Sequence, residues 1–147
     1  MNFLEMNGLQ TAQTHFKDIF QNNIHRDYAD AMLDWLEQET DFFTAPSSTK
    51  YHGAHPGGLL VHSLNVYYRL RNIAIRDLAD KEDPGKCRLS EEQEETVAIR
   101  WHMGAYDDAA KADSRAMAAA MAASPWVWRL QEADMCAAWI DEREAGQ

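Results

Sequence analysis

An all-α fold is predicted for this chain of 147 residues, as one domain built of about six helices. Apolar residues recur every three or four positions in several windows, which is the spacing of a helix with one buried face. No window alternates apolar and polar residues as a half-buried strand does. Residues that start and stop helices stand at the borders of these windows, so the pattern predicts a compact bundle over residues 1–147.

Two amphipathic helices are expected first, over residues 11–24 and 27–39. A loop from Thr40 to Gly58 follows, because Pro, Ser and Gly are concentrated there. The apolar residues that recur at helical spacing in the second helix are Tyr28, Met32, Trp35 and Leu36.

The next helix is expected over residues 59–80, because a Glu-Asp-Pro-Gly turn signal follows it. Ser90 and Gln93 form a capping box for a further helix, which runs to about Met103. Gly104 is expected to end that helix, since glycine readily adopts the left-handed conformation found just after helices.

The C-terminal part of the chain predicts two more helices. Residues 108–123 are rich in Ala, the residue with the highest helix propensity. Ser124 and Pro125 then begin a last helix that ends near Asp141, because Pro is favoured at the first helical position.

Charge and composition disfavour several kinds of partner. A net charge of −10 repels a polyphosphate backbone, so nucleic acid is not expected as a partner. No apolar run approaches the roughly 20 residues of a membrane helix, so no membrane association is expected. The first residues lack the features of a signal peptide, and two cysteines, Cys87 and Cys136, are too few for a disulfide framework. A cytoplasmic location is therefore expected.

The last expected helix carries a carboxylate within its apolar stripe. Asp134 follows Val127 and Leu130 at helical spacing and precedes Ala137 and Ala138. An ionised carboxylate in a packed interior costs several kcal/mol unless it is paired or binds a metal. Asp134 is therefore expected either to bond to a neighbouring Arg or helix cap, or to serve as a metal ligand or catalytic carboxylate.

Two histidines occupy similar positions on other helices. His62 shares a stripe with Leu59 and Val66, and His102 lies at the end of its helix, before Gly104. Each has a structural interpretation, as a hydrogen-bonded core residue and as a cation at a helix C-terminus, respectively. Two imidazoles and one carboxylate on three helices also suit a divalent transition metal in a helical bundle.

The loop before the third expected helix offers two weaker signals. His52 and His55 form a His-x-x-His motif seven residues before His62, but no cysteine or acidic residue stands nearby in sequence to complete a zinc site. Gly57 and Gly58 precede a helix, where backbone N–H groups can bind an anion.

Three segments resemble a bacterial branch of the HD-domain phosphohydrolases. They are DFFTAPSSTKYHGAHPGGLLVHSLNV at Asp41–Val66, AIRWHMG at Ala98–Gly104 and ADMCAAWIDE at Ala133–Glu142. The resemblance covers most of residues 28–142. It implies an all-α fold and metal-dependent hydrolysis of phosphate esters, often nucleotides. In this family a first His, a central His-Asp doublet, further His residues and a last Asp hold the metals.

The resemblance assigns roles to individual residues of this chain. The first His corresponds to His62, the last Asp to Asp134 and a late His to His102. His52 matches a residue that is usual in the branch, whereas His55 stands where an aromatic residue is more usual. His52 and His55, together with Arg100 of the Arg-Trp-His-Met-Gly segment, are ligand-binding candidates.

The central His-Asp doublet of the family is absent. Only 39 residues, 63–101, separate His62 from His102, and they contain no histidine, so the middle of the family's fold is shortened. If residues 59–80 form one helix, Asp77 lies about 22 Å from His62, so it could replace the doublet only if the helix broke or another subunit supplied it.

Three hypotheses about function follow. In the first, a degraded metal site binds a nucleotide, another phosphorylated small molecule or a protein partner, with weak or no hydrolase activity. In the second, one divalent metal ion on His62, His102 and Asp134 supports an active phosphohydrolase. In the third, the chain is a structural or oligomeric module without ligand or metal. The shortened middle leaves an apolar gap, so we expect either that neighbouring helices repack into a rearranged bundle or that a second copy fills the gap in a homodimer.

Overall fold

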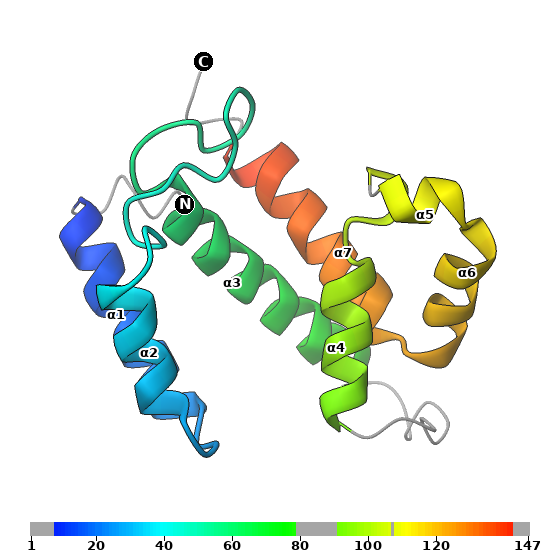
Figure 1. Cartoon of the computed structure of the whole chain (residues 1–147), viewed down its shortest axis with the longest axis horizontal. Helices are drawn as coiled ribbons and strands as arrows, with labels where there is room; N and C mark the ends of the chain where they lie inside the picture. The colour runs from blue at the N-terminus through cyan, green and yellow to red at the C-terminus, as the bar shows by residue number, and fades with distance from the viewer. Residues whose placement is uncertain (1–7, 79–90, 107, 143–147) are drawn as a thin grey trace. The chain divides into compact units, whose positions relative to one another are not determined.

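The computed structural model describes residues 8–78, 91–106 and 108–142, which form helices joined by turns, with no strand among them (Figure 1). The predicted all-α class is therefore confirmed. The chain divides into two units, of which the first comprises residues 1–65 and 137–147 and the second residues 66–136. No helix in the described part of the chain has both the length and the apolar content needed to cross a membrane.

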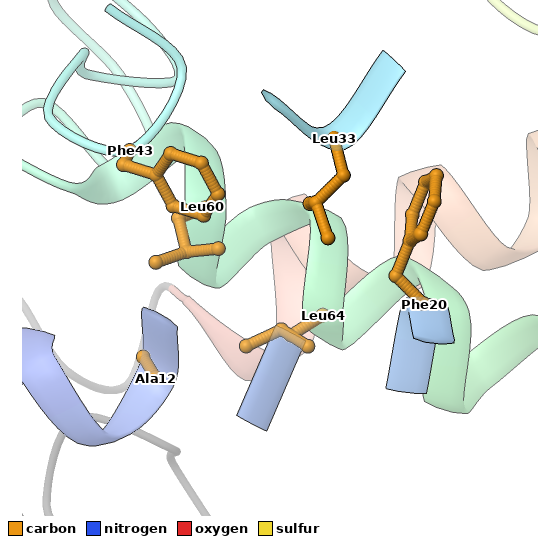
Figure 2. Close-up of a cluster of buried hydrophobic side chains, with 6 residues drawn as sticks. All are labelled: Ala12, Phe20, Leu33, Phe43, Leu60 and Leu64. Atoms are coloured by element: carbon orange, nitrogen blue, oxygen red, sulfur yellow. The ribbon is translucent and has the colours of Figure 1, made fainter. Parts of the chain in front are cut away.

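The first unit is built around two short helices, the beginning of a long one and a turn from the end of the chain. Its elements are α1 (Leu9–Asn23), α2 (Ala29–Gln38), the first part of α3 (Gly58–Leu78) and the π-helical turn η3 (Ala137–Asp141). Figure 2 shows its buried core, to which α1, α2, α3 and the loop before α3 all contribute. The core side chains are Ala12, Phe20, Leu33, Phe43, Leu60 and Leu64.

Aromatic rings connect α1 to the loop that precedes α3. The ring centroid of Phe16 lies 5.1 Å from that of Phe42 and 5.7 Å from that of Phe43, the latter edge to face. Such tilted and edge-on pairs are the favoured arrangements of aromatic rings in protein cores. They fix the loop against α1 and so position the residues that follow it in sequence.

The buried face of α2 differs from the apolar set that the sequence pattern indicates. Leu33 is buried and Leu36 packs against the core, whereas Tyr28, Met32 and Trp35 are exposed. Successive residues of a helix are turned by about 100°, so adjacent positions face different ways. Packing against α1 selects the face of Leu33, and the larger side chains point outward.

The second unit contains the rest of α3 and the helices that follow it. These are α4 (Glu91–Trp101), the 3-10 turn η2 (Gly104–Tyr106), α5 (Asp108–Ala112), α6 (Ser114–Ala123) and α7 (Trp126–Cys136). Helix α4 packs against α7 and α6, and α6 also packs against α7. The apolar side chains buried in this unit include Ile73, Ala98, Ala120, Val127 and Ala133.

Residues 108–123 form two helices rather than the one that their Ala content predicts. Asp113 interrupts them, and its carboxylate accepts hydrogen bonds from the backbone N–H groups of Arg115 and Ala116. An Asp at this position satisfies N–H groups that a new helix leaves without partners. The capping carboxylate therefore outweighs the propensity of the surrounding alanines.

Helix α3 is continuous from Gly58 to Leu78, so no break in it brings Asp77 back toward His62. The Asp77 carboxylate accepts hydrogen bonds from Arg76 (2.8 Å) and from the buried Arg129 of α7 (3.2 Å). Arg76 also donates to Glu132 of α7. The bonds from Arg76 and Arg129 hold the pKa of Asp77 below its ordinary value. Asp77 thus belongs to an ion-pair network that joins α3 to α7 within the second unit.

Candidate metal centre

Three side chains from distant parts of the sequence meet in the first unit. His52 comes from the loop before α3, His62 from the first turns of α3, and Glu142 follows directly after η3. One ligand atom from each lies within 4.8 Å of the other two. We call these three residues the His-His-Glu cluster. It is the one group of this kind found among the described residues.

His62 is held at the centre of the cluster by the helix on which it lies. Its neighbours Leu60, Val61 and Leu64 are buried in the core, which fixes the rotation of α3 and leaves the imidazole half-buried at its edge. The Nδ1 atom of His62 lies 2.8 Å from Oε1 of Glu142. The rings of His62 and His52 are 5.1 Å apart between centroids.

Glu142 reaches the cluster because the chain ends its last helix in a π-helical turn. The backbone N–H of Glu142 donates to the carbonyl of Ala137, five residues earlier, and Ala137 and Ala138 are buried. A π-helical turn carries one more residue than an α-helical turn, so it changes the direction in which the following side chain points. Such turns are frequent at functional sites.

The Glu142 carboxylate is buried and only partly satisfied. Its side chain is 5% exposed, and Oε1 faces both His62 and the amide nitrogen of Asn65, which donates at 3.4 Å. Oε2 has no hydrogen-bond partner within the described structure. A buried carboxylate oxygen without a partner is costly, so its presence points to a group that the oxygen binds.

The loop that carries His52 is clamped to the start of α3. Ser47 donates from its hydroxyl to the carbonyl of His52 (2.8 Å), and from its backbone N–H to the carbonyl of Gly53 (3.1 Å). A Cβ atom on Gly58 would lie 2.0 Å from that Gly53 carbonyl oxygen. Only glycine at position 58 permits this approach of loop and helix, which sets the distance between His52 and His62.

The donor types of the cluster are those that divalent transition metals bind, and one pair of donor atoms has a suitable separation. Two ligand atoms about 2.1 Å from one ion and at a right angle to each other are about 3.0 Å apart, close to the separation of His62 Nδ1 and Glu142 Oε1. Two imidazoles and one carboxylate are the protein ligands of many zinc and non-haem iron sites, which keep further coordination positions open. The unpartnered Oε2 of Glu142 supplies a second carboxylate donor.

The structure places the histidines of the predicted His-x-x-His motif in different settings. His52 belongs to the cluster, whereas His55 is exposed and outside it, with its Nδ1 lying 3.1 Å from the carbonyl oxygen of Pro56. The acidic partner that the motif lacks in sequence is Glu142, 80 residues after His62. No local pattern marks Glu142, because it follows the end of the last predicted helix.

The other predicted site residues lie in the second unit. His102 is half-buried just after α4, and its Nδ1–H donates to the carbonyl of Ile99 (2.6 Å), as expected for a histidine at a helix C-terminus. Arg100 stacks over the Trp101 ring, 4.6 Å from its centroid, and Asp134 is half-buried on α7. A site made by His62, His102 and Asp134 would join the two units, and it stays a prediction.

The expectation that Gly57 and Gly58 bind an anion through their N–H groups is wrong. The N–H of Gly57 donates to the carbonyl of Thr44, and that of Gly58 donates to the carbonyl of His55. Leu59 likewise donates to Ala45. These donors hold the loop on the start of α3 and are therefore already used.

Comparison of the chain with protein families, curated proteins and solved structures finds no match.

Proposed function

We propose that this protein binds one divalent transition metal ion through His52, His62 and Glu142, and that a phosphorylated small molecule such as a nucleotide binds at the open positions of that ion. One observation carries the proposal. The buried oxygen Oε2 of Glu142, unpartnered in the described structure, lies in a cluster with two imidazoles. The resemblance to the HD-domain phosphohydrolases supports the choice of ligand.

The residues of the chain have separate tasks in this proposal. A bound metal ion would neutralise charge on the phosphoryl oxygens of the ligand. His52 and His62 would provide nitrogen donors, and Glu142 would provide a negatively charged oxygen donor to the ion. Asn65 donates to Glu142 Oε1 and so helps to hold the carboxylate in its position.

Hydrolysis of the phosphorylated ligand is expected to be weak or absent. The chain lacks the His-Asp doublet of the family that it resembles, and the cluster has one acidic residue. Two-metal sites bring an ion to both the attacking and the leaving oxygen, and a site for one ion loses part of that stabilisation. The second candidate is an active single-metal phosphohydrolase that uses His62, His102 and Asp134, for which the resemblance provides the support.

Metal titration by calorimetry tests the proposed ligands. Zn²⁺, Mn²⁺, Co²⁺ and Ni²⁺ are titrated separately into metal-free protein, and we expect one site with His52, His62 and Glu142 intact. His52→Ala, His62→Ala and Glu142→Gln are each expected to lower affinity by about 10–100-fold or more. His55→Ala is the matched control, since His55 lies in the same loop but outside the cluster.

Two results of this titration would contradict the proposal. Unchanged affinity in Glu142→Gln, with loss in His102→Ala and Asp134→Asn, would favour the second candidate. Absence of binding for all four ions would favour the structural module. Thermal shifts with a nucleotide panel and turnover of bis-p-nitrophenyl phosphate, each with and without metal, then separate ligand binding from hydrolysis.

The proposal includes a cytoplasmic homodimer. A hollow of about 510 Å³ in the second unit supports self-association, because it is lined mainly by apolar side chains from α3, α4 and α7. The residues around it are Leu70, Glu94, Glu95, Ala98, Ile99, Trp126 and Leu130. A monomer in sedimentation velocity at all concentrations would remove this part of the proposal.

A further inference from the structure

We propose that Ser47 is a positioning residue for the His-His-Glu cluster, and that its hydroxyl group holds His52 where it can bind the metal ion. This role rests on the metal site of the proposed function. The Ser47 hydroxyl donates to the carbonyl of His52 (2.8 Å), and the Ser47 backbone N–H donates to the carbonyl of Gly53 (3.1 Å). Two hydrogen bonds from one residue therefore hold the backbone directly after the His52 side chain.

His52 is the one ligand of the cluster that lies on a loop. His62 lies on α3, whose rotation is fixed by its buried neighbours, and Glu142 follows η3, in which two alanines are buried. His52 lies outside the helices, and the bond from Ser47 is the only hydrogen bond that it makes with the described residues. Groups that orient a metal ligand in this way affect metal affinity although they do not touch the ion.

The same turn brings the Ser47 hydroxyl to the edge of the cluster. Gly53 has a φ of +56°, and a Cβ atom at this position would lie 2.1 Å from Ser47 Oγ and 3.4 Å from Glu142 Oε2. The hydroxyl and the carboxylate oxygen therefore approach Gly53 on the side where other residues carry a side chain. Glycine at position 53 allows the loop to pack closely between Ser47 and Glu142.

Ser48 provides a matched comparison within the same loop. Its hydroxyl accepts hydrogen bonds from the backbone N–H groups of Lys50 (3.3 Å) and Tyr51 (3.1 Å), and Ser48 is half-buried, as Ser47 is. Neither of these bonds involves His52. Removal of the Ser48 hydroxyl therefore perturbs the loop alone, whereas removal of the Ser47 hydroxyl also releases His52.

Calorimetric titration of the full chain with Zn²⁺ tests the role of Ser47. Ser47→Ala is expected to lower the affinity by about 10-fold or more, since groups that orient metal ligands typically contribute about 10–100-fold. Ser47→Thr keeps the hydroxyl and should retain most of the affinity, and Ser48→Ala should bind as the native protein does. Circular dichroism verifies that each variant is folded. Ser47→Thr and Ser47→Val, which differ in the hydroxyl at similar volume, carry the test if Ser47→Ala is not folded.

A double-mutant cycle shows whether Ser47 acts through His52. In His52→Ala no imidazole is left to be held, so addition of Ser47→Ala should lower the affinity by less than about twofold. A general effect on the loop would lower the affinity by the same factor in both backgrounds. The visible absorption of bound Co²⁺ is a second readout, because Ser47→Ala should shift the bands toward those of His52→Ala. These bands decide the test if His52→Ala binds too weakly for calorimetry.

Failure of this inference and failure of the proposed function give different results. Absence of metal binding by the native protein, or unchanged affinity in His52→Ala, would remove the metal site and the role of Ser47 with it. If native binding depends on His52, three results would each overturn the role of Ser47 alone. They are unchanged affinity in Ser47→Ala, an equal loss in Ser48→Ala, and an undiminished effect of Ser47→Ala in the His52→Ala background.

Discussion

Polar side chains among apolar ones have different explanations in this protein, and their contacts distinguish them. His102 donates to the carbonyl of Ile99, a contact typical of a histidine at a helix end. Asp77 is held by two guanidinium groups. His62 instead meets a second histidine and a buried carboxylate with an unpartnered oxygen. Similar positions in a helical pattern therefore carry different chemistry.

Asp77 provides a pH-dependent prediction at the level of one side chain. Hydrogen bonds from Arg76 and Arg129 lower its pKa from the ordinary value of 3.8. A lowered pKa in the folded state adds stability above the pKa of the unfolded state, and this stability is lost as the pH falls through the folded value. We expect Asp77→Asn to lower the melting temperature at pH 6, with the difference from the native protein shrinking below about pH 3.8.

Thermal unfolding followed by circular dichroism, at several pH values between about 2.5 and about 7, measures this difference. Asp108→Asn is the control, since the Asp108 carboxylate pairs with Lys111 on an exposed surface. An exposed pair contributes little, so its melting temperature should follow that of the native protein. A pH-independent effect of Asp77→Asn would contradict the prediction.

The borders of the helices follow from local signals. Gly104, with a φ of +52°, lies shortly after the end of α4, and the hydroxyl of Ser124 accepts from the N–H of Trp126 where α7 begins. Both signals lie within two or three residues of the helix end that they mark, so they can be recognised in the sequence. Asp113 acts over the same short range, although the alanines around it conceal its effect.

Removal of the Asp113 cap should destabilise α6. Asp113→Ala leaves the N–H groups of Arg115 and Ala116 without their acceptor, and we expect a loss of about 1 kcal/mol in the free energy of unfolding. Urea denaturation followed by circular dichroism measures it. Asp113→Asn keeps an acceptor oxygen and should retain most of the stability; an equal loss in both variants would argue against capping.

The turn η3 shows how one element sets the chemistry of another. Its hydrogen bond from Glu142 to Ala137 spans five residues and turns Glu142 toward α3. Periodicity of the last helix predicts its apolar residues but not this change of register. Ala137 and Ala138 of this turn are buried, so the turn is packed against other parts of the first unit.

At the scale of the whole molecule, the His-His-Glu cluster lies entirely in the first unit. Binding of a metal to the folded state stabilises it by mass action, by about 2.7 kcal/mol at 100 times the dissociation constant. The stabilised part is the part that holds the ligands. The location of increased protection therefore reports which residues bind the ion.

Hydrogen exchange with mass spectrometry should show slower exchange on addition of Zn²⁺ in residues 52–65 and 137–142, with little change in residues 91–136. His62→Ala should abolish the effect. Slower exchange around both His102 and Asp134 as well would instead support the site composed of His62, His102 and Asp134.

The all-α class, most of the helices and the candidacy of His62 as a metal ligand could be inferred from the residues alone, whereas the division of residues 108–123 into two helices is missed and His52 gives only a weak signal. Helix formation and capping depend on side chains three or four positions apart, and such neighbours stand together in the sequence. The exposure of Met32 and Trp35 and the arrival of Glu142 beside His62 required the folded chain. Both follow from packing between segments that are distant in sequence. Close packing of these segments determines which side of α2 is covered and where the residues after η3 lie.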